Sequence, residues 1–137
     1  MEIRALRVGD DRLVAAASHL FDGPATPEAT ARFLGEAGHH LLIAYEADRA
    51  VGFVSGVEVT HPDKGTEMFL YELAVDEAFR RRGIGRALVE HLAALARDAG
   101  CYGMWVVTDD DNRAARATYE RTGGVPETEQ VVEVWTF

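Results

Sequence analysis

The sequence contains one strongly basic segment, Arg80-Arg81-Arg82-Gly83-Ile84-Gly85, in a chain whose formal net charge is −9. Two glycines one residue apart let the backbone approach a ligand closely, because no Cβ stands in the way. A long amphipathic segment begins at Ile84, and the first turn of a helix there would present unpaired N–H groups with partial positive charge. Such a loop favours a phosphate group, although a solvated basic loop explains the glycines alone equally well.

The loop departs from two common phosphate-binding patterns. Leu88 stands where a dinucleotide fingerprint has its third small residue, which argues against a nicotinamide-type cofactor. No Gly-Lys-Ser/Thr follows the glycines, which excludes the nucleoside triphosphate loop. The pattern that remains is Arg-x-x-Gly-x-Gly.

Carboxylates occur at two positions where they could act on an amine. Glu72 interrupts the otherwise apolar run 68–75, and desolvation there would raise its pKa towards that of a general base. A partnered carboxylate, or one that faces an open cleft, is the alternative. Asp109, Asp110 and Asp111 follow the next apolar run. We expect one of the three to cap the following helix, which leaves a surplus that could bind substrate ammonium groups.

The elements that must position these residues are predicted from hydrophobic periodicity. We expect strands at 2–7, 40–45, 50–59, 68–75, 101–108 and 131–137, and helices at 11–21, from Thr26 to about 35, at 84–99 and from about 113 to 122. This order predicts one α/β domain over residues 1–137, with a mixed sheet. The strand–helix–strand unit at 68–108 should be a right-handed crossover, so that its two strands are parallel and end at the same edge.

The element order and three motifs resemble the GNAT acetyltransferase superfamily. The motifs are the strand through Leu73-Ala74-Val75, the loop from Arg80 to Gly85, and the helix signature Asn112-x-x-Ala115-x-x-x-Tyr119-x-x-x-Gly123. The resemblance covers about half of the chain. It implies a mixed, mostly antiparallel sheet flanked by about four helices, with a central parallel strand pair splayed around acetyl-CoA.

The resemblance also implies roles for individual residues. The backbone of Leu73, Ala74 and Val75 would pair with the pantetheine arm of coenzyme A, and a backbone N–H near Val75 would stabilise the oxyanion. The pyrophosphate and the rest of the cofactor would be held by Arg80, Arg81, Arg82, Gly83, Ile84, Gly85, Arg86, Asn112, Ala115 and Tyr119. The Tyr119 phenol would protonate the departing thiolate, unless its ring only packs on the sheet. Glu72 and Asp109 are the alternatives for the general base.

Within the superfamily, two segments resemble the aminoglycoside 3-N-acetyltransferases: Tyr71-Glu72-Leu73-Ala74-Val75 and Thr108-Asp109. Those enzymes commonly have aspartate at the position of Glu72. The resemblance predicts transfer of an acetyl group to the 3-amino group of an aminoglycoside, with Glu72, Asp109, Asp110 and Asp111 as substrate-binding residues. A polyamine, a peptide or protein amine, and a non-catalytic acyl-CoA-binding regulatory module are the alternatives.

Composition narrows the partners further. The excess of acidic charge argues against nucleic acid, and the sequence has no apolar run long enough to span a membrane. The single cysteine, Cys101, excludes an intrachain disulfide and is compatible with the cytoplasm. The histidines lack metal-ligand spacing, so we expect no metal site. An apolar terminal strand through Trp135 and Phe137 is compatible with a homodimer.

Overall fold

The computed structural model describes residues 1–137 and contains one five-stranded sheet in the order β1-β2-β3-β4-β5. Neighbouring strands are antiparallel except for β4 and β5, which are parallel. The strands are β1 (Glu2–Ala5), β2 (His39–Glu46), β3 (Arg49–His61), β4 (Gly65–Val75) and β5 (Met104–Val106). The helices are α1 (Asp11–Ala16), α2 (Pro27–Gly35), α3 (Ile84–Asp98) and α4 (Arg113–Arg121), with 3-10 turns at Ser18–Leu20 (η1) and Glu77–Phe79 (η2). The predicted mixed α/β sheet and crossover are therefore confirmed.

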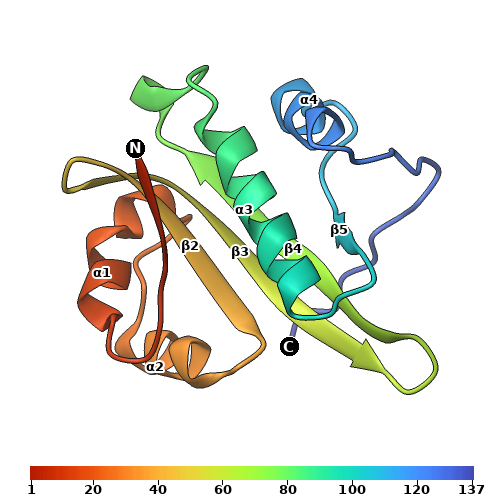
Figure 1. Ribbon diagram of the computed structural model, residues 1–137, viewed down its shortest axis with the longest axis horizontal. Coiled ribbons are helices and arrows are strands. Elements are labelled where there is room, and N and C mark those ends of the chain that lie inside the picture. Colours follow the sequence, from red (N-terminus) through yellow and green to blue (C-terminus); the bar gives the residue numbers. More distant parts are fainter.

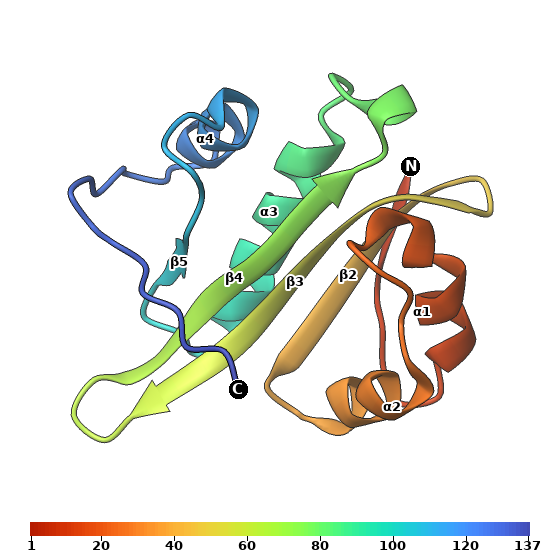
Figure 2. The same ribbon diagram turned by 180° about the vertical axis from the view of Figure 1, so that it is seen from behind.

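Helices cover both faces of the sheet (Figure 1, Figure 2). The predicted apolar stripe of α3 packs on one face, where its buried residues are Ile84, Leu88, Val89, Leu92 and Ala96. On the opposite face, α1 and α2 cover Leu41, Ile43 and Phe53. Leu88 is fully buried, so its truncation to alanine should destabilise the fold by about 2–5 kcal/mol. None of the helices is both long and apolar enough to cross a bilayer.

The parallel strands β4 and β5 separate soon after they meet. Their pairing runs only from Met68 to Leu70 on β4 and from Met104 to Val106 on β5. Beyond Leu70, residues 72–75 of β4 pair with β3 on one side and have no partner strand on the other. Unpaired strand edges offer backbone N–H and C=O groups to a ligand. The sheet is thus open between β4 and β5 along the last residues of β4, just before the basic loop.

A β-bulge in β4 decides which face Glu72 occupies. Ser55 pairs with Glu72 and Gly56 pairs with Leu70, so Tyr71 is an extra residue without a partner. Strict alternation would put Glu72 on the same face as Leu70, under α3. The extra residue reverses the alternation. Glu72 therefore lies on the face of α1 and α2, together with Ser55.

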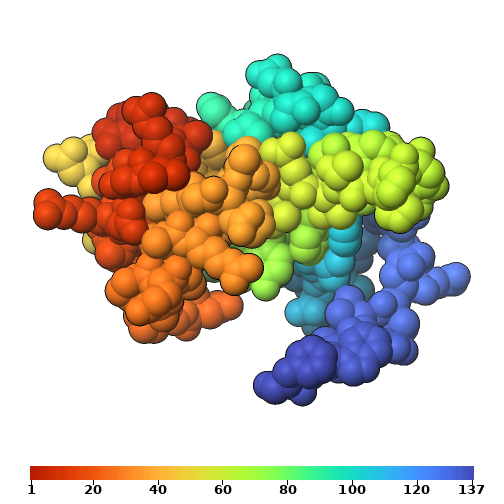
Figure 3. All heavy atoms as spheres, turned by 90° about the horizontal axis from the view of Figure 1, so that it is seen from below, coloured from red at the N-terminus to blue at the C-terminus, as the bar shows by residue number.

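Three expectations about the elements were wrong. The helix expected at 11–21 ends at Ala16 and continues only as the turn η1. The nearly continuous apolar run at 68–75 predicts a strand buried on both faces, but Tyr71 in β4 is 60% exposed. Residues 131–137 form no strand, since none of their backbone groups joins the sheet and Phe137 is fully exposed. A strand needs a partner edge, and this segment stands apart from the body of the molecule (Figure 3).

Candidate active site

The segment 80–86, here called the anion loop, exposes a row of backbone donors. Arg81 and Gly83 both have positive φ, at 64° and 79°. This left-handed geometry directs successive N–H groups into one concave surface. The N–H groups of residues 81–86 have no acceptor within the protein, and α3 begins at Ile84 without a side-chain cap. The backbone therefore fits a phosphate-bearing ligand at the N-terminus of α3.

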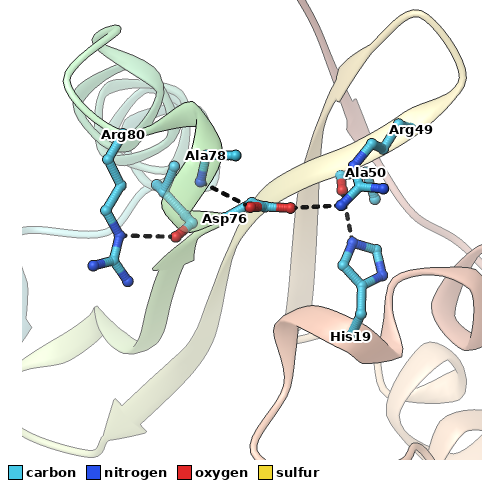
Figure 4. A network of polar contacts seen from close by, with 7 residues as sticks. His19, Arg49, Ala50, Asp76, Ala78 and Arg80 are labelled. Atoms are coloured by element: carbon cyan, nitrogen blue, oxygen red, sulfur yellow. Dashed lines mark hydrogen bonds and ion pairs between the residues drawn. The ribbon is translucent and has the colours of Figure 1, made fainter.

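A polar network fixes the approach to the anion loop (Figure 4). The Asp76 carboxylate accepts a hydrogen bond from the Ala78 N–H at 3.0 Å and forms an ion pair with Arg49 at 2.8 Å. The Arg49 guanidinium holds the pKa of Asp76 below its usual value. Arg80 Nε donates to the Val75 carbonyl at 3.2 Å. These contacts attach the loop to the ends of β3 and β4.

The arginines of the loop differ in how far other residues engage them. Arg82 lies over the Phe79 ring, 5.0 Å from its centroid. Arg86 Nε donates to Glu90 at 2.8 Å, which partly offsets its charge. Arg80 uses one nitrogen on Val75, and Arg81 forms no ion pair or side-chain hydrogen bond within the protein. Arg80, Arg81 and Arg82 thus carry charge that no carboxylate neutralises.

Gly85 connects the anion loop with its neighbours. A Cβ built on Gly85 would lie 3.6 Å from Val75 Cγ2 and 3.8 Å from Thr118 Cγ2. The first turn of α3, the end of β4 and the helix α4 therefore meet at this residue. Tyr119, the next residue along α4, packs against the core on the α3 face. Burial raises the pKa of the Tyr119 phenol.

A backbone hydrogen bond and the bulge together fix the position of Glu72. Its N–H donates to Ser55 Oγ at 3.2 Å, across the β3–β4 pair. The side chain is half-buried, and burial raises its pKa, with a smaller contribution from the negative charge of Asp22. A raised pKa makes the carboxylate a stronger proton acceptor near neutral pH.

Glu72 lines a pocket of about 230 Å³ between the sheet and the helices α1 and α2. Three phenylalanines form much of its wall: Phe21, Phe33 and Phe53. The Phe21 and Phe53 rings meet edge to face, with centroids 4.9 Å apart. His19 Nε2 lies 2.9 Å from the Ala50 carbonyl, which ties η1 to β3 beside this wall (Figure 4). Sequence reasoning placed Phe21 and Phe33 in helices but did not recognise that they meet Glu72.

The aspartates after β5 lie apart from this pocket. Asp109, Asp110 and Asp111 are exposed, and their carboxylates form no ion pair. The expectation that one of them caps α4 was wrong, because the cap is Asn112, whose side chain accepts a hydrogen bond from the Ala115 N–H at 3.1 Å. A helix-capping side chain accepts a hydrogen bond from the N–H two or three residues later, and Asn112 stands three residues before Ala115. Asn112 and Ala115 thus shape the start of α4.

The acid whose charge acts on Glu72 is Asp22, which sequence reasoning missed. Asp22 follows Phe21 at the end of the first helical segment, and only the folding of α1 and η1 against the sheet brings it near β4. The structure has no group of three or more His, Cys, Asp or Glu side chains placed to hold a metal ion.

Comparison with known proteins identifies the family. The model of the acetyltransferase (GNAT) family matches residues 10–124. The chain belongs to the GNAT family. Acetyl-CoA is the cofactor of this family, and the unpaired edge of β4 and the N–H groups of the anion loop fit its pantetheine arm and its phosphates.

Individual relatives have different acceptors. A ribosomal protein bS18-alanine N-acetyltransferase of Salmonella typhimurium is 42% identical over 57 residues, which are 42% of this chain and 38% of that protein. The chain spans less than half the length of the first curated relatives that it matches. Among solved structures, an aminoglycoside acetyltransferase from a soil metagenomic sample superposes with a TM-score of 0.90 at 20% identity, covering 99% of this chain and 95% of the other. An aminoglycoside N-acetyltransferase in complex with CoA has a TM-score of 0.78 at 22% identity, covering 98% and 93%.

Proposed function

We propose that this protein transfers the acetyl group of acetyl-CoA directly to an amine of a cationic small molecule. The observation that carries the proposal is the position of Glu72, a half-buried carboxylate with a raised pKa beside the unpaired edge of β4. Acetyl-CoA, when bound, supplies the acetyl group and a sulfur that leaves as a thiolate. The chain must supply a proton acceptor for the amine and a proton donor for the sulfur.

Glu72 is the proposed proton acceptor. An aliphatic amine with a pKa of about 10 is mostly protonated at neutral pH, so its nitrogen must lose a proton before or during attack. The Glu72 carboxylate takes this proton directly or through one water molecule. Asp109 is the weaker candidate, because it is exposed and nothing in the fold desolvates it.

Tyr119 is the proposed proton donor. Burial raises the pKa of its phenol, so the group stays protonated at neutral pH. Tyr119 packs on the α3 face, whereas Glu72 lies on the α1–α2 face. The proposed donor and acceptor therefore lie on opposite faces of the sheet. Burial also raises the pKa of the Cys101 thiol, which argues against an acyl-enzyme formed on this residue.

The acceptor should be cationic, because the chain carries a net charge of −9 and three unpaired aspartates follow β5. The 3-amino group of an aminoglycoside is the specific acceptor that the sequence predicts. The fold resemblance to aminoglycoside acetyltransferases supports its inclusion as a test substrate. The similarity to an enzyme named for a ribosomal protein alanine supports the inclusion of peptide amines.

The proposal includes a homodimer. Five apolar side chains in the last seven residues are at least 68% exposed in the single chain: Val131, Val132, Val134, Trp135 and Phe137. Contiguous exposed apolar groups favour association, and a second copy of the chain is the partner that we propose. Light scattering coupled to size exclusion should give twice the mass of 15.0 kDa. Val134→Asp with Trp135→Ser should yield the monomer, and an unchanged mass would assign the interface elsewhere.

The enzymatic proposal is tested by thiol release from acetyl-CoA in the presence of aminoglycosides, polyamines, simple amines and basic peptides. We expect release with at least one small amine, and mass spectrometry should find the acetyl group on its nitrogen. Tight CoA binding without thiol release for any amine would instead favour a non-catalytic acyl-CoA-binding module. Acetylation of peptides alone would rule out the small-molecule acceptor.

A further inference from the structure

The pocket beside Glu72 is mainly apolar. Most of its lining is hydrophobic: Val14, Phe21, Ala25, Ala29, Phe33, Leu41, Phe53 and Tyr71. Several of these side chains also belong to the core between the sheet and the helices α1 and α2. The wall is therefore part of the folded structure and is formed before a ligand arrives.

The polar groups of the pocket are few, and two of its hydroxyls accept backbone hydrogen bonds. Thr26 Oγ1 accepts the Ala29 N–H at 3.3 Å as the cap of α2, and Ser55 Oγ accepts the Glu72 N–H at 3.2 Å. Thr30 supplies a third hydroxyl and is 8% exposed, and the phenol of Tyr71, which is 60% exposed, supplies a fourth. Glu72 is the only charged residue in the lining. The pocket thus offers one anionic contact on an apolar surface.

The volume of the pocket limits the group that enters it. An apolar protein cavity of about 150 Å³ holds one benzene molecule. The pocket of about 230 Å³ therefore has room for one ring, or an alkyl chain of similar size, with a short linker. A sugar ring would also fit by size. Its hydroxyls, however, would lose their hydrogen bonds to water and would face mainly phenylalanine rings, which offer no replacement partners.

We propose that this pocket binds an apolar group, preferably aromatic, attached to the acceptor amine, with the amine itself at Glu72. This inference rests on the proposed acetyl transfer and specifies its substrate class. The acceptor is then a monoamine on an apolar body, such as an arylalkylamine. A polyhydroxylated aminoglycoside or a linear polyamine leaves the apolar wall uncovered or its own polar groups unpaired.

The first experiment compares acceptors for the wild-type chain. 2-Phenylethylamine, n-hexylamine, ethanolamine, spermidine and kanamycin are assayed for thiol release at saturating acetyl-CoA. We expect kcat/KM for 2-phenylethylamine to exceed that for ethanolamine at least about tenfold, because even one methylene in an apolar pocket can change kcat/KM by that much. Equal or better turnover of kanamycin or spermidine overturns the inference while it leaves the acetyltransferase proposal intact.

The second experiment fills the pocket. Ala29 is exposed on α2 and lines the pocket, whereas Ala31 is exposed on the same helix and does not. Ala29→Leu should raise KM for 2-phenylethylamine at least about tenfold. It should leave the affinity for CoA unchanged. Ala31→Leu makes the same change outside the pocket and should leave both constants as in wild type. An unchanged KM in Ala29→Leu contradicts the inference.

Calorimetry with 2-phenylethylamine separates the inference from the proposed function. Binding to wild type that weakens in Ala29→Leu, without thiol release for any amine, would support the pocket and refute the enzymatic proposal. No binding and no turnover of 2-phenylethylamine would refute the pocket, whatever the other amines do.

Discussion

The anion loop would contact the phosphates of the cofactor through backbone groups, whereas the proposed acceptor pocket beside Glu72 would contact its ligand through side chains. The loop is one continuous segment, and its donors are the N–H groups of residues 81–86. The pocket combines residues from α1, α2, β2, β3, β4 and the segments between them. A site built from backbone groups recognises the charge and shape of its ligand with little dependence on side chains, so many relatives can share it. A side-chain site can change its specificity residue by residue, which explains how one family serves different acceptors.

The largest test of this contrast is Glu72→Gln. Glutamine keeps the shape of the side chain but takes no proton, so kcat should fall about a hundredfold to a thousandfold. The affinity for CoA, measured by calorimetry, should not change. The pKa of Glu72 is raised, so protonation should inactivate the base at a pH above the usual glutamate pKa of about 4.3. As the pH is lowered, wild-type kcat/KM should therefore begin to fall above that value, and the variant should lack this fall.

Glu67→Gln is the matched control, since it removes a carboxylate from the other end of the same strand, outside the pocket. Equal losses of kcat in the two variants would show that the rate depends on the negative charge of β4 as a whole and not on a proton acceptor at Glu72.

Tyr119→Phe should have the next largest effect, a loss of about tenfold to a hundredfold in kcat. The loss is smaller than for Glu72 because a thiol with a pKa of about 8.5 leaves moderately well without a proton. Steady-state kinetics and CoA calorimetry measure the two quantities separately. A weaker CoA affinity with unchanged kcat would make Tyr119 a packing residue.

Gly83→Asp should weaken CoA binding about tenfold or more, because it adds a negative charge to a cradle of N–H donors and forces a side chain into left-handed backbone. Calorimetry with CoA checks this. Gly100→Asp is the matched control: Gly100 also has a positive φ, of 83°, but lies at the opposite end of α3. Both variants should lose stability, and only Gly83→Asp should lose cofactor affinity. Equal affinities in the two variants would place the phosphates elsewhere.

Asp109→Asn should produce the smallest change. The carboxylate is exposed, so its removal should raise KM less than about fivefold, and only for acceptors with several positive charges. In about 1 M salt, where the screening length is about 3 Å, the difference should disappear. A large, salt-independent loss of kcat would instead favour Asp109 over Glu72 as the proton acceptor.

The same contrast explains what the sequence could predict. The anion loop was predictable because its glycines, its arginines and the following helix are adjacent in the chain. Glu72 was recognisable as the one charge in an apolar strand, but its face depends on the unpaired Tyr71, which no periodicity indicates. Phe21, Phe33 and Asp22 needed the tertiary fold, since they come from the first third of the chain. The apolar residues at 131–137 predicted a strand, but the segment pairs with no other strand.

Successive residues of a strand point to opposite faces, so the one extra residue at Tyr71 determines the face on which Glu72 lies. Deletion of Tyr71 would shift every later residue of β4 to the opposite face, with Glu72 under α3 and Leu73 in the pocket. No single side-chain replacement on this strand reproduces that exchange. In this fold, the loss of one codon would therefore exchange the residues that line the proposed acceptor pocket, a step that comparisons of substitutions alone would overlook.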